Sequence, residues 1–217
     1  MTTVEEMAKL VHRSLSPIVE PLHECFSAGS EMVDQFLPRR ISGPDYAWYR
    51  THSLRASVRA NLEDRAPELG DWSVGGNPKR NGELRLLHKD DALTMRVLRD
   101  GRAPKLLVPT AGHSVTRRAF WSNDPLAGFE QEDLFGKTEQ TLLLLWQELD
   151  EGQFEIRVVR PINPGSFGRT VKTDMQIDLA PLQTDFEDLV FEVENEQEPF
   201  WQEIAEEELE GNGGNAG

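Results

Sequence analysis

The chain has few of the features on which several classes of protein depend. It contains one cysteine, Cys25, which excludes an internal disulfide and any zinc site that needs several thiolates. Its longest apolar run, residues 142–146, is far shorter than the roughly 18 residues that predict a membrane helix. The first residues are acidic, where a signal or transit peptide would be basic. We therefore expect a soluble, cytoplasmic protein with no membrane contact.

Basic residues are missing from one long stretch near the C-terminal end. Residues 185–210 contain twelve Asp and Glu side chains and no Lys or Arg. Residues 37–120, in contrast, hold sixteen basic and nine acidic side chains, a balance of +7, although the whole chain has a net charge of −15. Such an uneven distribution of charge favours electrostatic contact with a partner, or between two parts of the same chain.

The first third of the chain has the apolar spacing of helices. Hydrophobic residues recur every three or four positions from Val4 to Phe26, which predicts an amphipathic helix. Ser16 followed by Pro17 suits a helix start, so we expect a break into two helices near residue 16, with Pro21 as a further interruption. A helical turn through Met32 and a later helix over residues 45–64 complete this layer.

From Trp72 onward the apolar residues alternate with polar ones, as in strands. Residues 84–86 and 93–98 predict a hairpin across the turn 89–91, and residues 142–148 and 154–161 predict a second hairpin. We also expect a short strand over residues 105–108, a helical turn over 116–121 and a last strand over 171–179.

These patterns predict an α+β fold. In it, N-terminal helices pack on a mainly antiparallel sheet of five to six strands, and an acidic C-terminal tail follows. We expect residues 1–66 to form the helical layer and residues 67–182 the sheet, both within one domain. Residues 183–217 are expected to form an acidic, partly disordered tail.

The central basic block is the strongest candidate for a binding surface. Phosphates require several cationic donors in one patch, and aromatic side chains can stack on unpaired bases. Aromatic residues are interleaved with the basic ones at Tyr46, Trp48, Tyr49, Phe120 and Trp121. The candidate residues for nucleic-acid or anion binding are Arg50, Arg55, Arg59, Lys79, Arg80, Arg85, Arg96, Arg117 and Arg118. We expect the three arginines of the helix to share one face, and Arg85 and Arg96 to point outward from the first hairpin. The other interpretation is a solvated face whose arginines pair with the carboxylates of this chain.

The acidic stretch also contains apolar side chains, which are unexpected in a segment that only increases solubility. Phe191, Phe200, Trp201 and Ile204 are candidate anchors for docking on a basic surface. That surface could belong to another protein or to the central block of this chain.

Residues that resemble catalytic or metal sites have simpler interpretations. Glu83, His88, Asp90 and Asp91 lie within nine positions, but Asp is favoured at a hairpin turn, and Glu83 and His88 should point to opposite faces of a strand. The pairs Glu83–Arg85 and Glu155–Arg157 have the spacing of a nuclease motif with Arg instead of Lys, and Arg does not lose its proton to act as a base.

Two further loops have the composition of active-site segments without the residues that would complete one. His113 has no nucleophile motif near it, and the glycine-rich loop 164–169 lacks the ending of a phosphate-binding loop. We expect no metal and no cofactor.

The sequence therefore favours a non-catalytic regulatory or interaction protein that binds a basic partner protein or a nucleic acid through its charges. The alternative is a hydrolytic enzyme, for example a metal-dependent nuclease, whose site forms only in three dimensions. The sequence does not indicate the oligomeric state.

Overall fold

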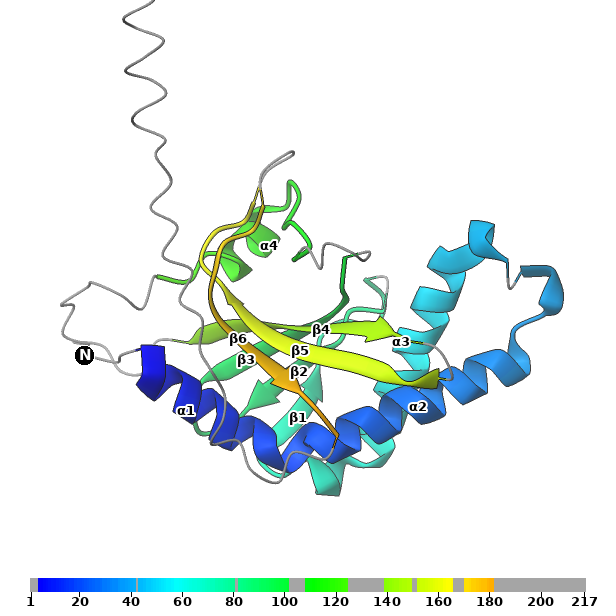
Figure 1. Ribbon diagram of the computed structural model, residues 1–217, viewed down its shortest axis with the longest axis horizontal. Helices are drawn as coiled ribbons and strands as arrows, with labels where there is room; N and C mark the ends of the chain where they lie inside the picture. Colours follow the sequence, from blue (N-terminus) through cyan, green and yellow to red (C-terminus); the bar gives the residue numbers. More distant parts are fainter. Residues whose placement is uncertain are drawn as a thin grey trace, which may run out of the picture.

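A six-stranded sheet forms the centre of the computed structural model, with its strands in the order of the sequence (Figure 1). The structure describes residues 4–41, 43–80, 82–101, 108–124, 139–149, 152–165 and 170–181. The strands are β1 (Trp72–Gly75), β2 (Arg85–His88), β3 (Leu93–Arg99), β4 (Gln140–Glu148), β5 (Phe154–Pro161) and β6 (Thr173–Leu179). All neighbours are antiparallel except β3 and β4, which are parallel. The expected α+β class and the mainly antiparallel sheet are confirmed.

The helices occupy both sides of the sheet. They are α1 (Val4–Leu15), α2 (Val19–Phe36), α3 (Ala47–Asp64) and α4 (Val115–Phe120), with short 3-10 helices at Ser16–Ile18, Arg39–Ile41, Pro44–Tyr46 and Ala66–Leu69. The break near residue 16 is confirmed, because Pro17 lies in the 3-10 turn between α1 and α2. Pro21 does not interrupt a helix. It lies in the first turn of α2, where its missing N–H has no partner to lose.

The N-terminal helices cover one face of the sheet and create the larger core. In Figure 1, α1 and α2 run along the lower side of the sheet, and α4 lies on the upper side. Leu22 and Phe26 of α2 and Leu54 of α3 are buried with Leu144 and Val158 of the sheet. On the opposite face, a smaller cluster joins Phe120 and Trp121 to Leu98, Leu143, Leu145 and Val159. The sheet is therefore buried on both sides, which explains the unbroken apolar run at residues 142–146.

Two buried ion pairs stabilise the second face and the end of β5. Arg157 donates to Asp100 with N–O distances of 2.6 and 2.9 Å, and Arg160 donates to Asp174 at 2.5 Å. The Arg157 side chain is therefore buried rather than paired outward with Glu155, which is exposed.

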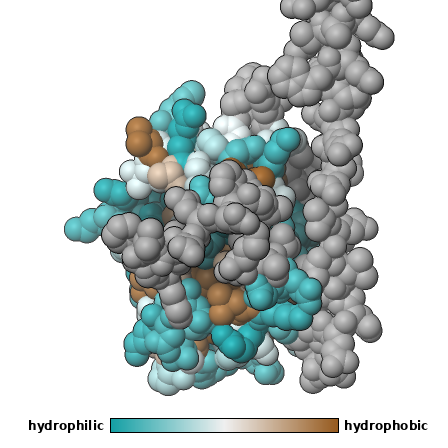
Figure 2. All heavy atoms as spheres, turned by 90° about the vertical axis from the view of Figure 1, so that its left-hand side faces the viewer, coloured by the Kyte–Doolittle hydropathy of each residue, from teal (hydrophilic) through white to brown (hydrophobic). Residues whose placement is uncertain are grey.

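Some expectations lie outside the described residues. The acidic tail, with its candidate anchors Phe191, Phe200, Trp201 and Ile204, belongs to residues 182–217, and most of the expected strand 105–108 is likewise not described. Among the described helices, none is long and apolar enough to cross a membrane. Figure 2 shows mainly hydrophilic side chains over the described part of one face, with small hydrophobic areas between them.

Candidate anion-binding site

Four arginines from four different elements form an arginine cluster on the second face of the sheet. Arg85 of β2 and Arg96 of β3 are directly opposite each other in the register of the two strands. Their neighbours Leu86 and Met95 point into the larger core, so Arg85 and Arg96 point to the face away from α1 and α2. The charges of Arg55 of α3 and Arg117 of α4 also act on Arg96, and we define the arginine cluster as Arg55, Arg85, Arg96 and Arg117.

Glu83 is the counter-ion of the arginine cluster. Its carboxylate accepts hydrogen bonds from Arg85 at 2.8 and 3.0 Å and forms an ion pair with Arg96 at 3.2 Å. Burial alone would raise the pKa of Glu83, but the hydrogen bonds from Arg85 and from the backbone N–H of Asn77 outweigh burial and lower it. Among the described residues, no other carboxylate forms an ion pair with the arginine cluster. The five side chains therefore carry a net charge of +3.

The positive charges of the cluster are partly removed from water. Burial lowers the pKa of Arg96, and the charges of Arg117, Arg85 and Arg55 lower it further, against the opposite effect of Glu83. Burial also lowers the pKa of Arg55, and the charge of Arg117 adds to this effect. A guanidinium does not lose its proton in a protein, so the mutual repulsion of these charges persists.

Two nitrogen atoms of the cluster have unused hydrogen-bonding capacity. The Nε atoms of Arg55 and Arg96 are buried and have no hydrogen-bond partner among the described residues. A buried donor without an acceptor costs about 1–3 kcal/mol. The Nη2 of Arg55 contacts His52 Nδ1 at 3.0 Å. Each of the two Nε–H groups has a hydrogen bond left to donate.

Aromatic rings hold two of the guanidinium groups in place. Arg85 lies over the ring of Phe120 at 5.3 Å and Arg96 over the ring of Trp121 at 5.9 Å, within the range of cation–π attraction. Trp121 is itself fixed by a hydrogen bond from its Nε1 to the carbonyl of Pro109 at 2.8 Å. Since both rings are buried, they support the arginines and do not offer a surface for stacking.

The other basic candidates lie elsewhere. Arg59 donates to the backbone carbonyls of Gly75 and Glu83 and thereby holds the β1–β2 connection to α3. Lys79, Arg80 and Arg118 are exposed, and no contact places their charges in the arginine cluster. The expected common face of Arg50, Arg55 and Arg59 is not formed, because a spacing of five residues turns a helix by about 140°.

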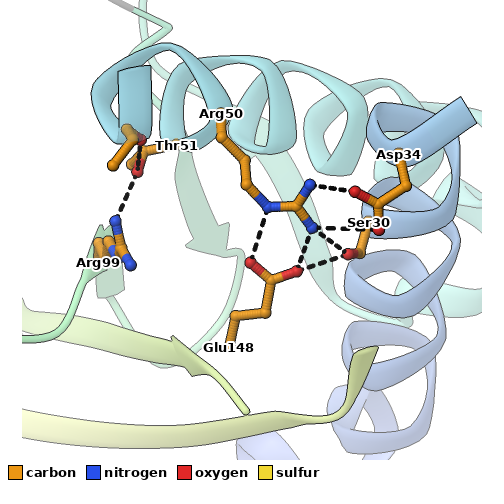
Figure 3. A network of polar contacts seen from close by, with 7 residues as sticks. Ser30, Asp34, Arg50, Thr51, Arg99 and Glu148 are labelled. Atoms are coloured by element: carbon orange, nitrogen blue, oxygen red, sulfur yellow. Dashed lines mark hydrogen bonds and ion pairs between the residues drawn. The ribbon is translucent and has the colours of Figure 1, made fainter. Parts of the chain in front are cut away.

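Arg50 lies in a separate ion-pair network that joins α2, α3 and β4 (Figure 3). Its guanidinium donates to Glu148 at 2.5 and 3.1 Å, to Ser30 at 2.9 Å and to Asp34. Burial alone would raise the pKa of Glu148, but the hydrogen bonds from Arg50 and Ser30 outweigh it and lower the pKa. Two carboxylates, those of Asp34 and Glu148, balance the charge of Arg50. Arg50 therefore has a structural role.

Replacing Arg50 with methionine is expected to lower the free energy of unfolding by about 1–3 kcal/mol, because it leaves the half-buried Glu148 without its main donor. Urea denaturation measures this change. Arg80→Met is the control, since the Arg80 side chain is exposed and its loss should change stability by less than about 0.5 kcal/mol. Equal stability of the two variants would show that the network contributes nothing.

The described residues that were considered for a metal or nuclease site do not form one. Within the described part of the chain, no three His, Cys, Asp or Glu side chains are placed to hold a metal ion. His88 Nδ1 accepts the backbone N–H of Asp91 at 3.1 Å, and the Asp91 carboxylate accepts from Ser14 at 2.6 Å. These contacts attach α1 to the β2–β3 turn. His113 lies exposed before α4.

Comparison with known protein families, with curated proteins and with solved structures finds no match to this chain.

All four arginines of the cluster are among the nine candidates that the sequence indicates, but the residues that contact them are not. Glu83 was weighed as a metal ligand, whereas in the structure it is the counter-ion of Arg85 and Arg96. His52 was not predicted, although the spacing of three residues between His52 and Arg55 on a predicted helix was an available signal.

Proposed function

We propose that the protein is a non-catalytic binding protein whose arginine cluster holds the phosphates of a nucleic acid. The observation that carries the proposal is the ratio of charges: Arg85 and Arg96 share the single carboxylate of Glu83, and the charges of Arg55 and Arg117 act on Arg96 without a carboxylate partner among the described residues. The buried Nε atoms of Arg55 and Arg96 support it, since each has a hydrogen bond left to donate.

Phosphate fits this arrangement for reasons of geometry and charge. A guanidinium presents two parallel N–H groups that match two oxygens of a phosphate. A polyanion can also contact several arginines at once, with the release of bound counter-ions as an additional driving force. The alternative, a hydrolytic enzyme with a metal site, gains no support from the described residues, since no three of their His, Cys, Asp or Glu side chains are placed to hold a metal ion.

In this proposal the acidic stretch competes with the nucleic acid for the arginine cluster. Residues 185–210 carry twelve carboxylates in the same chain as the arginine cluster, and a tethered anion acts at a high effective concentration. A basic partner protein would relieve the competition by binding the acidic stretch. Binding of the partner protein to the acidic stretch would then favour binding of nucleic acid to the arginine cluster, and the reverse.

The test compares two adjacent arginines of α4. Arg117 and Arg118 are both exposed and lie in the same short helix, but of these two only Arg117 lowers the pKa of Arg55 and Arg96 by its charge. Arg117→Gln is expected to weaken binding of a fluorescent oligonucleotide about threefold to tenfold, and to reduce the slope of log affinity against log salt by about one. Arg118→Gln removes the same charge and should have a clearly smaller effect.

Fluorescence anisotropy over about 50–200 mM salt measures both quantities. Equal losses in the two variants would indicate attraction by net charge and not by the arginine cluster. Binding that does not depend on salt, or no binding at all, would overturn the proposed function.

A further inference from the structure

The aromatic residues near the arginine cluster fall into two groups with different exposure. Phe120 and Trp121 are buried beneath Arg85 and Arg96. Trp48, Tyr46 and Tyr49, at the start of α3, are 61%, 41% and 40% exposed. Exposed apolar side chains that adjoin each other, as those of Trp48 and Tyr49 do, can mark a binding surface.

Trp48 is connected to the arginine cluster along one face of α3. The ring of Trp48 lies 6.3 Å from the ring of His52, and His52 contacts Arg55 at 3.0 Å. The three residues are spaced by four and three positions, so they share a helix face, and about 10 Å of helix axis separates Trp48 from Arg55. Tyr49 packs edge-on against Trp48 at 5.6 Å and limits the orientations of its ring.

We propose that the nucleic acid is single-stranded, DNA or RNA, and that an unpaired base stacks on Trp48 while the neighbouring phosphates bind the arginine cluster. This inference rests on the proposed function and names its ligand class. Cationic groups that follow a backbone, with an exposed ring beside them, form the arrangement that binds single strands without reading their sequence. In a duplex the bases are paired and stacked on each other, so a ring on the protein surface cannot reach their faces.

The experiment distinguishes binding of the bases from binding of the phosphates. The full-length chain and its Trp48→Ala and Trp48→Phe variants are titrated with four probes: oligothymidylate and oligouridylate of about twelve nucleotides, an abasic deoxyribose-phosphate strand of the same length, and a duplex. Trp48→Ala is expected to weaken binding of the two oligonucleotides about tenfold. Binding of the abasic strand and the duplex should remain unchanged, and Trp48→Phe should retain most of the affinity for the oligonucleotides. Since the Trp48 side chain is exposed, thermal unfolding should be the same in all three proteins.

Each outcome decides the inference. Loss of affinity for oligothymidylate alone, or for oligouridylate alone, supports stacking and identifies which nucleic acid is bound. If Trp48→Ala leaves all four probes unaffected, or weakens the abasic strand equally, base stacking is wrong and the aromatic surface serves another contact, such as a protein or a membrane. If Arg117→Gln still weakens every probe in that case, the proposed function stands without the inference. If the wild-type chain binds none of the probes, both fall.

Discussion

Replacing Asp100 with alanine is expected to lower the free energy of unfolding by about 3–5 kcal/mol. The carboxylate is 4% exposed and accepts two hydrogen bonds from Arg157, whose side chain is 7% exposed. Its removal takes two charged hydrogen-bond acceptors away from the buried guanidinium, and the neutral amide oxygen of Gln176 at 2.8 Å supplies no charge in return. Because breaking a buried ion pair by removing one member costs more than the pair contributes, the loss exceeds the net value of the ion pair itself.

Two further variants isolate this effect in urea denaturation. Asp178 is directly opposite Arg157 in the register of β5 and β6, but its side chain is exposed, so Asp178→Ala should cost less than about 1 kcal/mol. The double variant Asp100→Leu with Arg157→Met removes both charges and should recover much of the stability lost in Asp100→Ala. A loss of stability in Asp178→Ala as large as that in Asp100→Ala would show that burial does not increase the contribution of the Arg157–Asp100 pair.

The local pattern of the sequence was sufficient to predict most elements but not how distant elements meet. Alternation of apolar and polar residues correctly indicated both hairpins, and Pro17 indicated the break between α1 and α2. The parallel pairing of β3 with β4 was not predicted. A hairpin pattern defines its own two strands, and it contains no information about which edge of another hairpin it joins.

The same limit applies to the site. The alternation in β2 and β3 placed Arg85 and Arg96 on one face, as the structure has them, but they were expected to be solvated and instead lie half-buried against Phe120 and Trp121. The charges of Arg55 of α3 and Arg117 of α4 act on Arg96 because of how these helices pack in the fold, and no local spacing contains that information. Arg50 differs from Arg55 only in its direction from the helix, which brings it to Glu148.

Neutralising part of the acidic stretch is expected to raise the affinity for single-stranded oligonucleotide on the order of tenfold at low salt, if this stretch competes for the arginine cluster. The variant replaces Glu203, Glu206, Glu207, Glu208 and Glu210 with glutamine in the full-length chain. The gain should diminish as salt is added, since both the competitor and the ligand are screened. Fluorescence anisotropy at several salt concentrations measures it.

The matched control changes the net charge by the same amount at exposed positions of the folded part. It replaces Glu20, Glu31, Asp64, Asp71 and Glu155 with their amides. A general effect of net charge would raise the affinity equally in both variants, whereas competition for the arginine cluster requires a larger gain from the acidic stretch. Combining the first variant with Arg117→Gln sharpens the distinction, because a competitor that acts through the arginine cluster has less effect once the cluster is weakened. Equal gains with and without Arg117 would place the binding site of the acidic stretch elsewhere.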